Sequence, residues 1–160
     1  MKIWKKILGI GLAVGVSVGM SIMPVYADTT SILDEITDEE TTEDWAEDTS
    51  TILARSSNLS FGNVKIQRVA SNEIVIYGLT ACHKKCSKVY LSLYLERKVN
   101  GSYGTYKYWN FTANNADKLD KEIDVAVPSG TYYRVRGYHA ASNAGVKEST
   151  STLTSGIMVK

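Results

Sequence analysis

Tyrosines recur at alternate positions in three stretches of the chain, with arginines and lysines between or beside them. If each stretch is a strand, every second side chain shares one face. Tyrosine offers contact area at low entropic cost, and arginine adds paired hydrogen bonds and cation–π contacts. The pattern predicts a binding surface on the outside of the sheet. Its predicted members are Tyr90, Tyr94, Tyr106, Tyr108, Tyr132, Arg134, Arg136 and Tyr138. Stabilisation of the sheet itself is the alternative interpretation, since cross-strand aromatic pairs contribute about 0.2–1 kcal/mol each.

The two cysteines of the chain, Cys82 and Cys86, are the next groups with chemistry to offer. If the chain is exported, as its first 27 residues predict, the even number of cysteines predicts one intrachain disulfide, which closes a short loop and stabilises it little. A metal site is the rival, and it would need His83 or His139 with a carboxylate. No second cluster of ligands occurs in the sequence, so we expect a disulfide and neither a metal ion nor a cofactor.

Catalytic groups are sparse in residues 57–160. These residues include two histidines and seven acids, and most of the acids fall in turns or on outward strand positions. Gly-x-Ser-x-Gly, His-Glu-x-x-His and a phosphate-binding glycine loop are absent from the sequence. We therefore expect no catalytic residues and no enzyme. A hydrolase with His139 near two carboxylates remains an alternative.

The elements that position these groups follow an alternating pattern from about residue 60. Apolar and polar side chains alternate most clearly over 87–98, which is typical of a half-buried strand. Asn100-Gly101 then predicts a tight hairpin, and residues 103–112 return with Trp109 and Phe111 facing inward. With turns at regular spacing, residues 57–160 predict an all-β domain, an antiparallel β-sandwich of about seven strands. Asn114-Asn115 predicts a loop before a further strand at 119–127.

The first 27 residues predict a secretory signal peptide. Lys2, Lys5 and Lys6 precede an uncharged apolar stretch, and small residues stand at the cleavage site that ends at Ala27. The apolar stretch is short for a membrane span and is interrupted by glycines. We expect cleavage, an extracellular protein and no stable insertion in a membrane afterwards.

Residues 28–56 form an acidic segment. Residues 28–50 carry ten acids and no base, whereas residues 51–160 carry 15 bases against seven acids, a net charge of +8. Such a composition predicts a disordered linker. A pro-segment that shields the basic domain is the alternative. Nucleic acid is not an expected partner, because the chain is exported and lacks a nucleic-acid-binding motif.

Several motifs together resemble a known kind of protein. They are Leu93-Tyr94-Leu95-Glu96-Arg97, Asn100-Gly101-Ser102-Tyr103, Tyr108-Trp109 and Gly130-Thr131-Tyr132-Tyr133-Arg134-Val135-Arg136. Over residues 60–160 they resemble a family of small secreted proteins of unknown function from Gram-positive bacteria. Their order also resembles fibronectin type III-like and immunoglobulin-like sandwiches. The resemblance implies an adhesive or binding role without catalytic residues.

The sequence therefore predicts a secreted, non-enzymatic binding module for an unknown extracellular polymer or protein. A secreted antibacterial or host-directed effector, held inactive by the acidic segment, is the second hypothesis. This hypothesis rests on the charge contrast between the acidic segment and the basic domain.

Overall fold

A computed structural model describes residues 40–51 and 56–160 of the chain, and this part is all-β without a helix. The strands are β1 (Glu40–Thr41), β2 (Trp45–Thr51), β3 (Leu59–Ala70), β4 (Glu73–Val99), β5 (Ser102–Ala126), β6 (Thr131–Asn143), β7 (Val146–Leu153) and β8 (Gly156–Val159). The predicted all-β class is confirmed. Within these residues no helix has the length and apolar character needed to cross a membrane. The predicted signal peptide, residues 1–27, lies outside the described residues.

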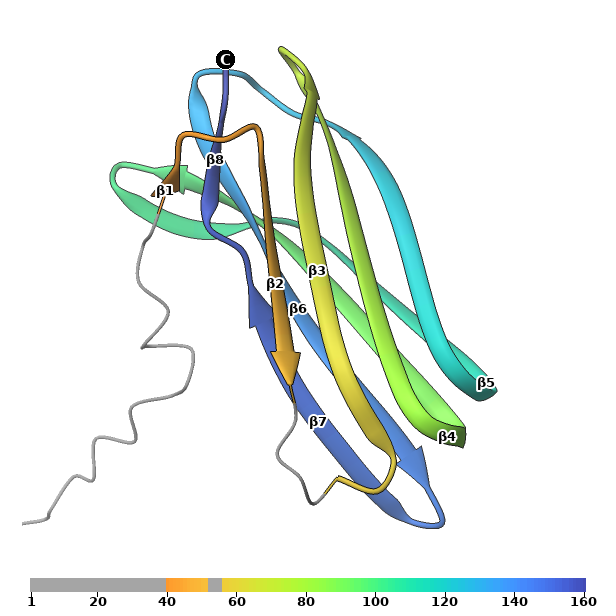
Figure 1. The fold of residues 1–160 in the computed structure, drawn as a ribbon. Helices are drawn as coiled ribbons and strands as arrows, with labels where there is room; N and C mark the ends of the chain where they lie inside the picture. Colours follow the sequence, from red (N-terminus) through yellow and green to blue (C-terminus); the bar gives the residue numbers. More distant parts are fainter. Residues whose placement is uncertain (1–39, 52–55) are drawn as a thin grey trace, which may run out of the picture.

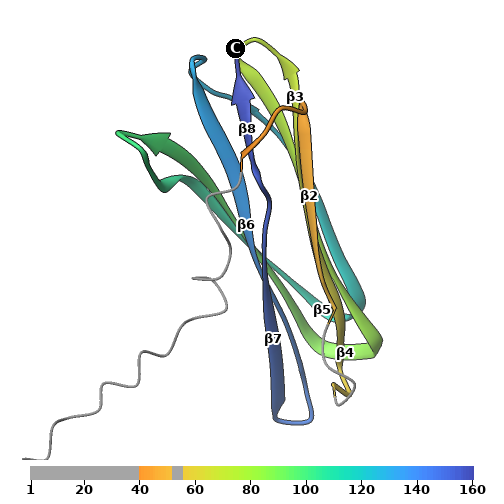
Figure 2. The ribbon, with the colours of Figure 1, turned by 60° about the vertical axis from the view of Figure 1, so that its left-hand side comes forward.

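The strands of the described part form one mixed sheet of eight strands. Its hydrogen-bonded order is β1-β8-β6-β4-β3-β2, with β5 beside β4 and β7 beside β6. The β1–β8 pair is parallel, and the remaining pairs are antiparallel. The sheet folds over so that its parts lie in two layers (Figures 1 and 2). The expected antiparallel β-sandwich of about seven strands is therefore corrected to a single mixed sheet of eight strands.

The sheet stays continuous because β4 and β5 each run through both layers. Residues 73–81 of β4 pair with β3 and with the second half of β5, whereas residues 86–99 pair with the first half of β5 and with β6. The register shifts between these halves, at Ala81 and Cys86. Asn115 has a φ of 50° within β5, so the asparagine bends the strand without reversing it. The loop predicted at Asn114-Asn115 is therefore a bend inside one long strand.

The predicted hairpin at Asn100-Gly101 is confirmed. Val99 pairs with Ser102, and the two turn residues have φ values of 52° and 85°, as a type I′ turn requires. The end of this β4–β5 hairpin projects beyond the rest of the sheet (Figures 1 and 2).

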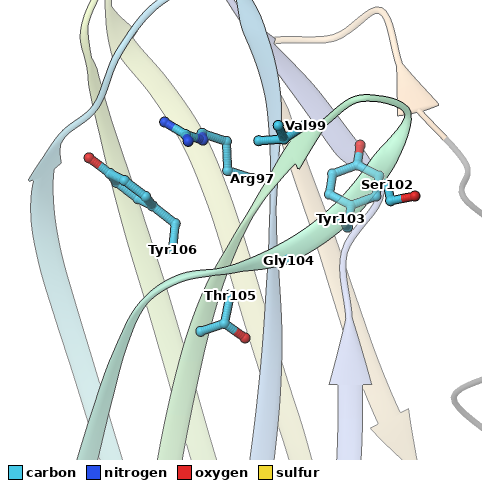
Figure 3. A pocket seen from close by; sticks show the side chains of 7 residues that line it. All are labelled: Arg97, Val99, Ser102, Tyr103, Gly104, Thr105 and Tyr106. Carbon is cyan, nitrogen blue, oxygen red and sulfur yellow. The ribbon is translucent and has the colours of Figure 1, made fainter.

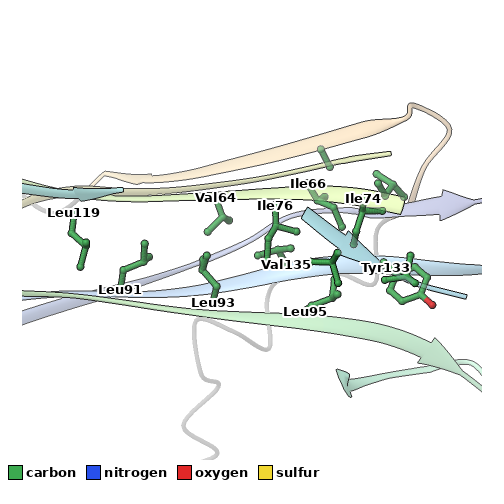
Figure 4. Packing of buried hydrophobic residues seen from close by; sticks show 14 of the residues in the cluster. Val64, Ile66, Ile74, Ile76, Leu91, Leu93, Leu95, Leu119, Tyr133 and Val135 are labelled. Carbon is green, nitrogen blue, oxygen red and sulfur yellow. The ribbon is translucent and has the colours of Figure 1, made fainter. Parts of the chain in front are cut away.

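The core fills the space between the two layers. Leu91, Leu93 and Leu95 of β4 are fully buried and face buried side chains of β3, such as Val64 and Ile66, from the other layer (Figure 4). The inward face predicted for 87–98 is thus confirmed. The inward prediction for Trp109 and Phe111 also agrees with the structure, since both are partly buried and pack on this core.

Part of the acidic segment belongs to the sheet. The disordered linker expected over 28–56 is wrong for residues 40–51, because β1 pairs with β8 and β2 pairs with β3 along its whole length. Ala46 is buried in the core, and the Asp48 carboxylate accepts a hydrogen bond of 2.8 Å from the backbone N–H of Leu153. Glu47 is tolerated because it points outward on an edge strand, whereas Asp48 shares the inward face of Ala46 and is tolerated because its carboxylate is hydrogen-bonded. The folded domain therefore begins at or before residue 40.

Candidate functional site

A tyrosine-rich surface covers the outer side of the layer formed by β7, β6, the second half of β4 and the first half of β5. Residues paired across neighbouring strands share a face, and Arg136, Tyr94 and Tyr108 are paired in one row across β6, β4 and β5. We call this surface the tyrosine face. Its members used below are Tyr90, Tyr94, Tyr103, Tyr108, Tyr132, Tyr138, Glu96, Lys98, Arg134, Arg136 and Lys147, and serine, threonine and asparagine side chains lie among them.

The ring of Tyr94 is contacted by both of its cross-strand neighbours, Arg136 and Tyr108. The Arg136 guanidinium lies 4.5 Å from the centroid of the Tyr94 ring. The Tyr108 ring stacks at a centroid distance of 6.3 Å and an interplanar angle of 22°. Cation–π and offset aromatic contacts of this kind each favour one orientation of the ring. Tyr94 is therefore held upright between its cross-strand neighbours, and it offers its ring edge and hydroxyl group to a partner.

Cations lie over the other rings of the face in the same way. Arg134 lies 4.0 Å from the Tyr103 centroid, and the Lys147 ammonium lies 4.8 Å from that of Tyr90 and 5.7 Å from that of Tyr138. The Lys98 ammonium is 5.9 Å from the ring of Tyr132. The tyrosines and cations thus form an array of three clusters on one face, around Tyr94, around Tyr103 with Tyr132, and around Tyr90 with Tyr138.

Much of the positive charge on the tyrosine face is balanced within the fold. Glu96 is only 7% exposed, and its carboxylate accepts hydrogen bonds from Nε of Arg134 at 2.7 Å and from Nε of Arg136 at 3.0 Å. Lys98 forms an ion pair with Glu40 of β1. Because a buried carboxylate holds both arginines, their guanidinium groups are fixed in position before any partner arrives.

The structure brings together seven of the eight residues predicted for this surface, and Tyr106 is the exception. A register shift follows the pair of Leu95 and Lys107, since the next residue, Glu96, pairs with Thr105. This bulge reverses the alternation of side chains along β5. Tyr106 therefore lies against the buried Tyr133, with ring centroids 6.1 Å apart.

Sequence reasoning missed the other members of the face. Tyr103 joins the surface through the same bulge, since it pairs with Lys98. Glu96 was missed because no local pattern pairs it with arginines about 40 positions away. Lys147 lies next to a loop and was missed because only the pairing of β6 with β7 brings it close to Tyr138.

His139, the base of the hydrolase hypothesis, is completely buried. Its Nε2 lies 2.8 Å from the Thr152 hydroxyl and its Nδ1 lies 3.0 Å from that of Thr80. Thr80 donates its own proton to the carbonyl of Tyr90, so we assign the imidazole proton to Nδ1 and the acceptor role to Nε2. Burial lowers the pKa of His139 to about 4, although a hydrogen bond to the Leu79 backbone opposes part of this effect. His139 is thus a neutral, fully bonded core residue.

Glu148 has its carboxylate enclosed by the beginning of β3. It accepts hydrogen bonds from the backbone N–H groups of Ser57, Asn58 and Leu59 at 2.8–3.0 Å and from the hydroxyl of Ser56. Burial alone would raise its pKa, but these hydrogen bonds outweigh burial and lower the pKa to about 2. Glu148 fastens residues 56–59 to β7.

Cys82 and Cys86 are both free thiols in the structure, so the predicted disulfide is not present there. They lie at the bend of β4, where the strand passes between layers. Burial, followed by the neighbouring Cys86, raises the pKa of the Cys82 thiol to about 12. Among the described residues no group of three or more histidine, cysteine or acidic side chains could hold a metal ion.

Fold and site together define an all-β protein with one folded sheet and a tyrosine-rich outer face. A model described as a family of unknown function, DUF6147, matches residues 32–157, and the chain belongs to that family. No curated protein matches the chain significantly.

Two solved structures match part of the chain. One is the sporulation control protein Spo0M of Bacillus subtilis, with 13% identity, a TM-score of 0.37 and coverage of 72% of this chain. This chain spans 50% of the length of that protein. The other is chicken MD-1 complexed with lipid IVa, with 12% identity, a TM-score of 0.31 and coverage of 71% of this chain and 91% of MD-1.

Proposed function

We propose that the protein is a secreted, non-enzymatic binding module whose tyrosine face holds an extracellular polymer or protein. The observation that supports this best is the array of three tyrosine–cation clusters on one exposed sheet face. The array is rich in Tyr, Arg, Ser and Asn, as antibody paratopes are. Export is proposed from residues 1–27, with their basic start, apolar stretch and small residues at the cleavage site.

Charge balance favours recognition through hydroxyl groups and ring edges over bulk attraction to an anionic polymer. Glu96 neutralises part of the charge of Arg134 and Arg136, and Glu40 pairs with Lys98. Fixed tyrosine rings offer hydrogen bonds and flat contact area with little loss of side-chain entropy on binding. We therefore expect a partner with many hydroxyl or amide groups, such as a glycan or an extended protein segment.

Retention of the purified protein on cell walls, glycans and extracellular-matrix proteins tests the proposal. We expect retention by one of these classes, and the Tyr94→Ser/Tyr108→Ser double variant should weaken it about tenfold or more, because it removes the centre of the array. Tyr77→Ser is the matched control, since Tyr77 pairs with Glu122 and Lys65 on the outside of the other layer. Absence of retention on every class at low salt, or equal weakening by the control, would contradict the proposal.

The fold restricts where the pro-segment of the effector hypothesis could end. A pro-segment ending near residue 56 would remove β1 and β2 from the sheet, so processing that leaves the sheet intact would have to occur before residue 40. The hydrolase hypothesis rested on an accessible His139, and this residue is enclosed by Thr80 and Thr152. Neither alternative has a supporting contact comparable to the tyrosine face.

A further inference from the structure

A hollow lies against the projecting end of the β4–β5 hairpin. Its volume is about 320 Å³, and it is lined by Arg97, Val99 and the run from Ser102 to Tyr106. Figure 3 shows the side chains of Arg97 and Tyr106 on the same side of the hairpin. The volume is near the lower end of the range for small-molecule sites. The hollow could accommodate a ligand about the size of one ring with a short substituent.

Gly104 forms part of the floor of this hollow, and nothing within the chain explains why it is a glycine. The other seven glycines among the described residues either have a positive φ or would clash if a Cβ were added. Gly104 has no positive φ, and an added Cβ would meet nothing within 4 Å. A glycine within a strand weakens the strand, but it allows a ligand to approach the backbone closely. We interpret Gly104 as leaving room for something outside the chain.

Arg97 stands directly opposite Gly104 in the hairpin register, so both face the hollow. Its guanidinium lies 5.0 Å from the centroid of the Tyr106 ring. Burial raises the pKa of the Tyr133 hydroxyl, and the nearby Arg97 opposes part of this effect. No carboxylate of the described residues forms an ion pair with Arg97. Arg134 and Arg136 on the tyrosine face, by contrast, share Glu96. A positioned cation without an anion therefore lines the hollow.

The remaining lining is largely apolar. Val99 is 49% exposed and Tyr106 is 36% exposed, so the cation stands beside an uncovered valine and an aromatic ring. An arginine favours a carboxylate with two oxygens in one plane, and the neighbouring surface favours a hydrophobic body.

We propose that this hollow binds a small carboxylate with an apolar body, with the carboxylate on Arg97 and the body over Gly104 against Val99 and Tyr106. The site is distinct from the proposed function, because Arg97, Val99 and Gly104 lie on the side of the hairpin opposite to the tyrosine face. Tyr103 of the tyrosine face also lines the hollow, but the tests below change no residue of that face. Either proposal can fail while the other stands.

Nuclear magnetic resonance titration of the purified protein tests the site, with benzoate and hexanoate as probes and benzamide and acetate as comparisons. We expect saturable shifts confined to residues 97–106 with benzoate or hexanoate. Benzamide, which lacks the charge, and acetate, which lacks the body, should each bind about tenfold more weakly or worse. If neither benzoate nor hexanoate gives saturable shifts at these residues, or if benzamide binds as tightly as benzoate, the proposal is wrong.

Two variants separate binding from folding. Gly104→Leu should fill the hollow and abolish binding with an unchanged melting temperature, because its Cβ enters open space. Arg97→Gln should weaken benzoate about tenfold, whereas Arg68→Gln, which removes a distant charge paired with Asp44, should leave binding unchanged. Full binding by a folded Gly104→Leu variant, or equal losses in the two arginine variants, would overturn the proposal.

Discussion

At the scale of single residues, His139 shows how a buried polar side chain is accommodated between the layers. The ring of His139 fits between the layers because Gly62 and Gly137 have no side chain, since a Cβ on either would lie within 2.5 Å of the ring. Thr80 and Thr152 then bond both ring nitrogens. A buried imidazole with both nitrogens bonded is stable only while it is neutral.

This neutrality makes stability depend on pH in a defined window. The pKa of His139 is lowered to about 4 in the folded protein from 6.5, so between these values the unfolded chain binds a proton that the folded chain does not. Stability therefore falls as pH falls through this window, by about 2 kcal/mol between about pH 7.5 and about pH 5. Urea unfolding at the two pH values measures the loss. His139→Gln should flatten this dependence, and the exposed His83→Gln should not.

The ionised carboxylate of Glu148 should also stabilise the fold, and this contribution is lost at a lower pH than that of His139. Its pKa is lowered from 4.5 to about 2, so its contribution is complete above 4.5 and is lost as pH falls towards 2. Glu148→Gln removes the charge and one acceptor oxygen, and for this partly exposed group we expect a loss of about 1–2 kcal/mol at neutral pH. Urea unfolding and faster amide exchange at Ser57, Asn58 and Leu59 would measure it. Glu73→Gln, an exposed carboxylate, should cause no comparable change.

At the scale of elements, the edges and the bend of the sheet decide where the domain ends and how it closes. β2 covers the outer edge of β3 with seven paired residues. The bend of β4 lies between Ala81 and Cys86, where four residues of β4 have no partner in β5. These two features are the places where a change in the chain should affect the whole sheet.

Truncation tests the assignment of the acidic segment to the fold. A chain beginning at residue 40 should unfold cooperatively, whereas one beginning at residue 57 loses β2, the buried Ala46 and the contact of Asp48 with Leu153. We expect the shorter chain to melt about 10 °C lower or to aggregate through the exposed edge of β3. Equal melting temperatures would show that residues 40–56 are dispensable for folding.

The bend also provides a test of the disulfide proposed from the sequence. Oxidation would join Cys82 to Cys86 with loss of two hydrogens, so the intact mass of protein recovered from an oxidising compartment should be about 2 Da lower than after reduction. The loop is short, and we expect at most about 2 kcal/mol of added stability. An unchanged mass after reduction would show that both remain thiols.

At the scale of the whole molecule, the charge contrast along the chain is partly cancelled in space. Residues 40–51 carry five of the ten acids of the acidic segment. Two of them return to the basic part, since Glu40 pairs with Lys98 and Asp44 pairs with Arg68. A uniformly basic surface of net charge +8 is therefore not what the folded molecule presents.

This charge balance predicts a weak dependence of partner binding on salt. Binding through the tyrosine face should weaken less than about tenfold between about 0.05 M and about 0.2 M salt, whereas several uncompensated contacts to an anionic polymer would cost a thousandfold or more. Retention measured over this salt range decides between the two modes. A steep loss would show that long-range attraction dominates.

The all-β class, the inward face of 87–98 and the Asn100-Gly101 hairpin followed from sequence alone, because alternation and turn conformation are local properties of the chain. Seven of the eight residues of the predicted surface also share one face for this reason. Contacts between distant residues decided the rest. The bulge opposite Leu95 exchanged Tyr106 for Tyr103, and the pairing of β2 with β3 ordered an acidic stretch whose composition indicated disorder. Strand register depends on the packing of partners far apart in sequence, and no local pattern contains that information.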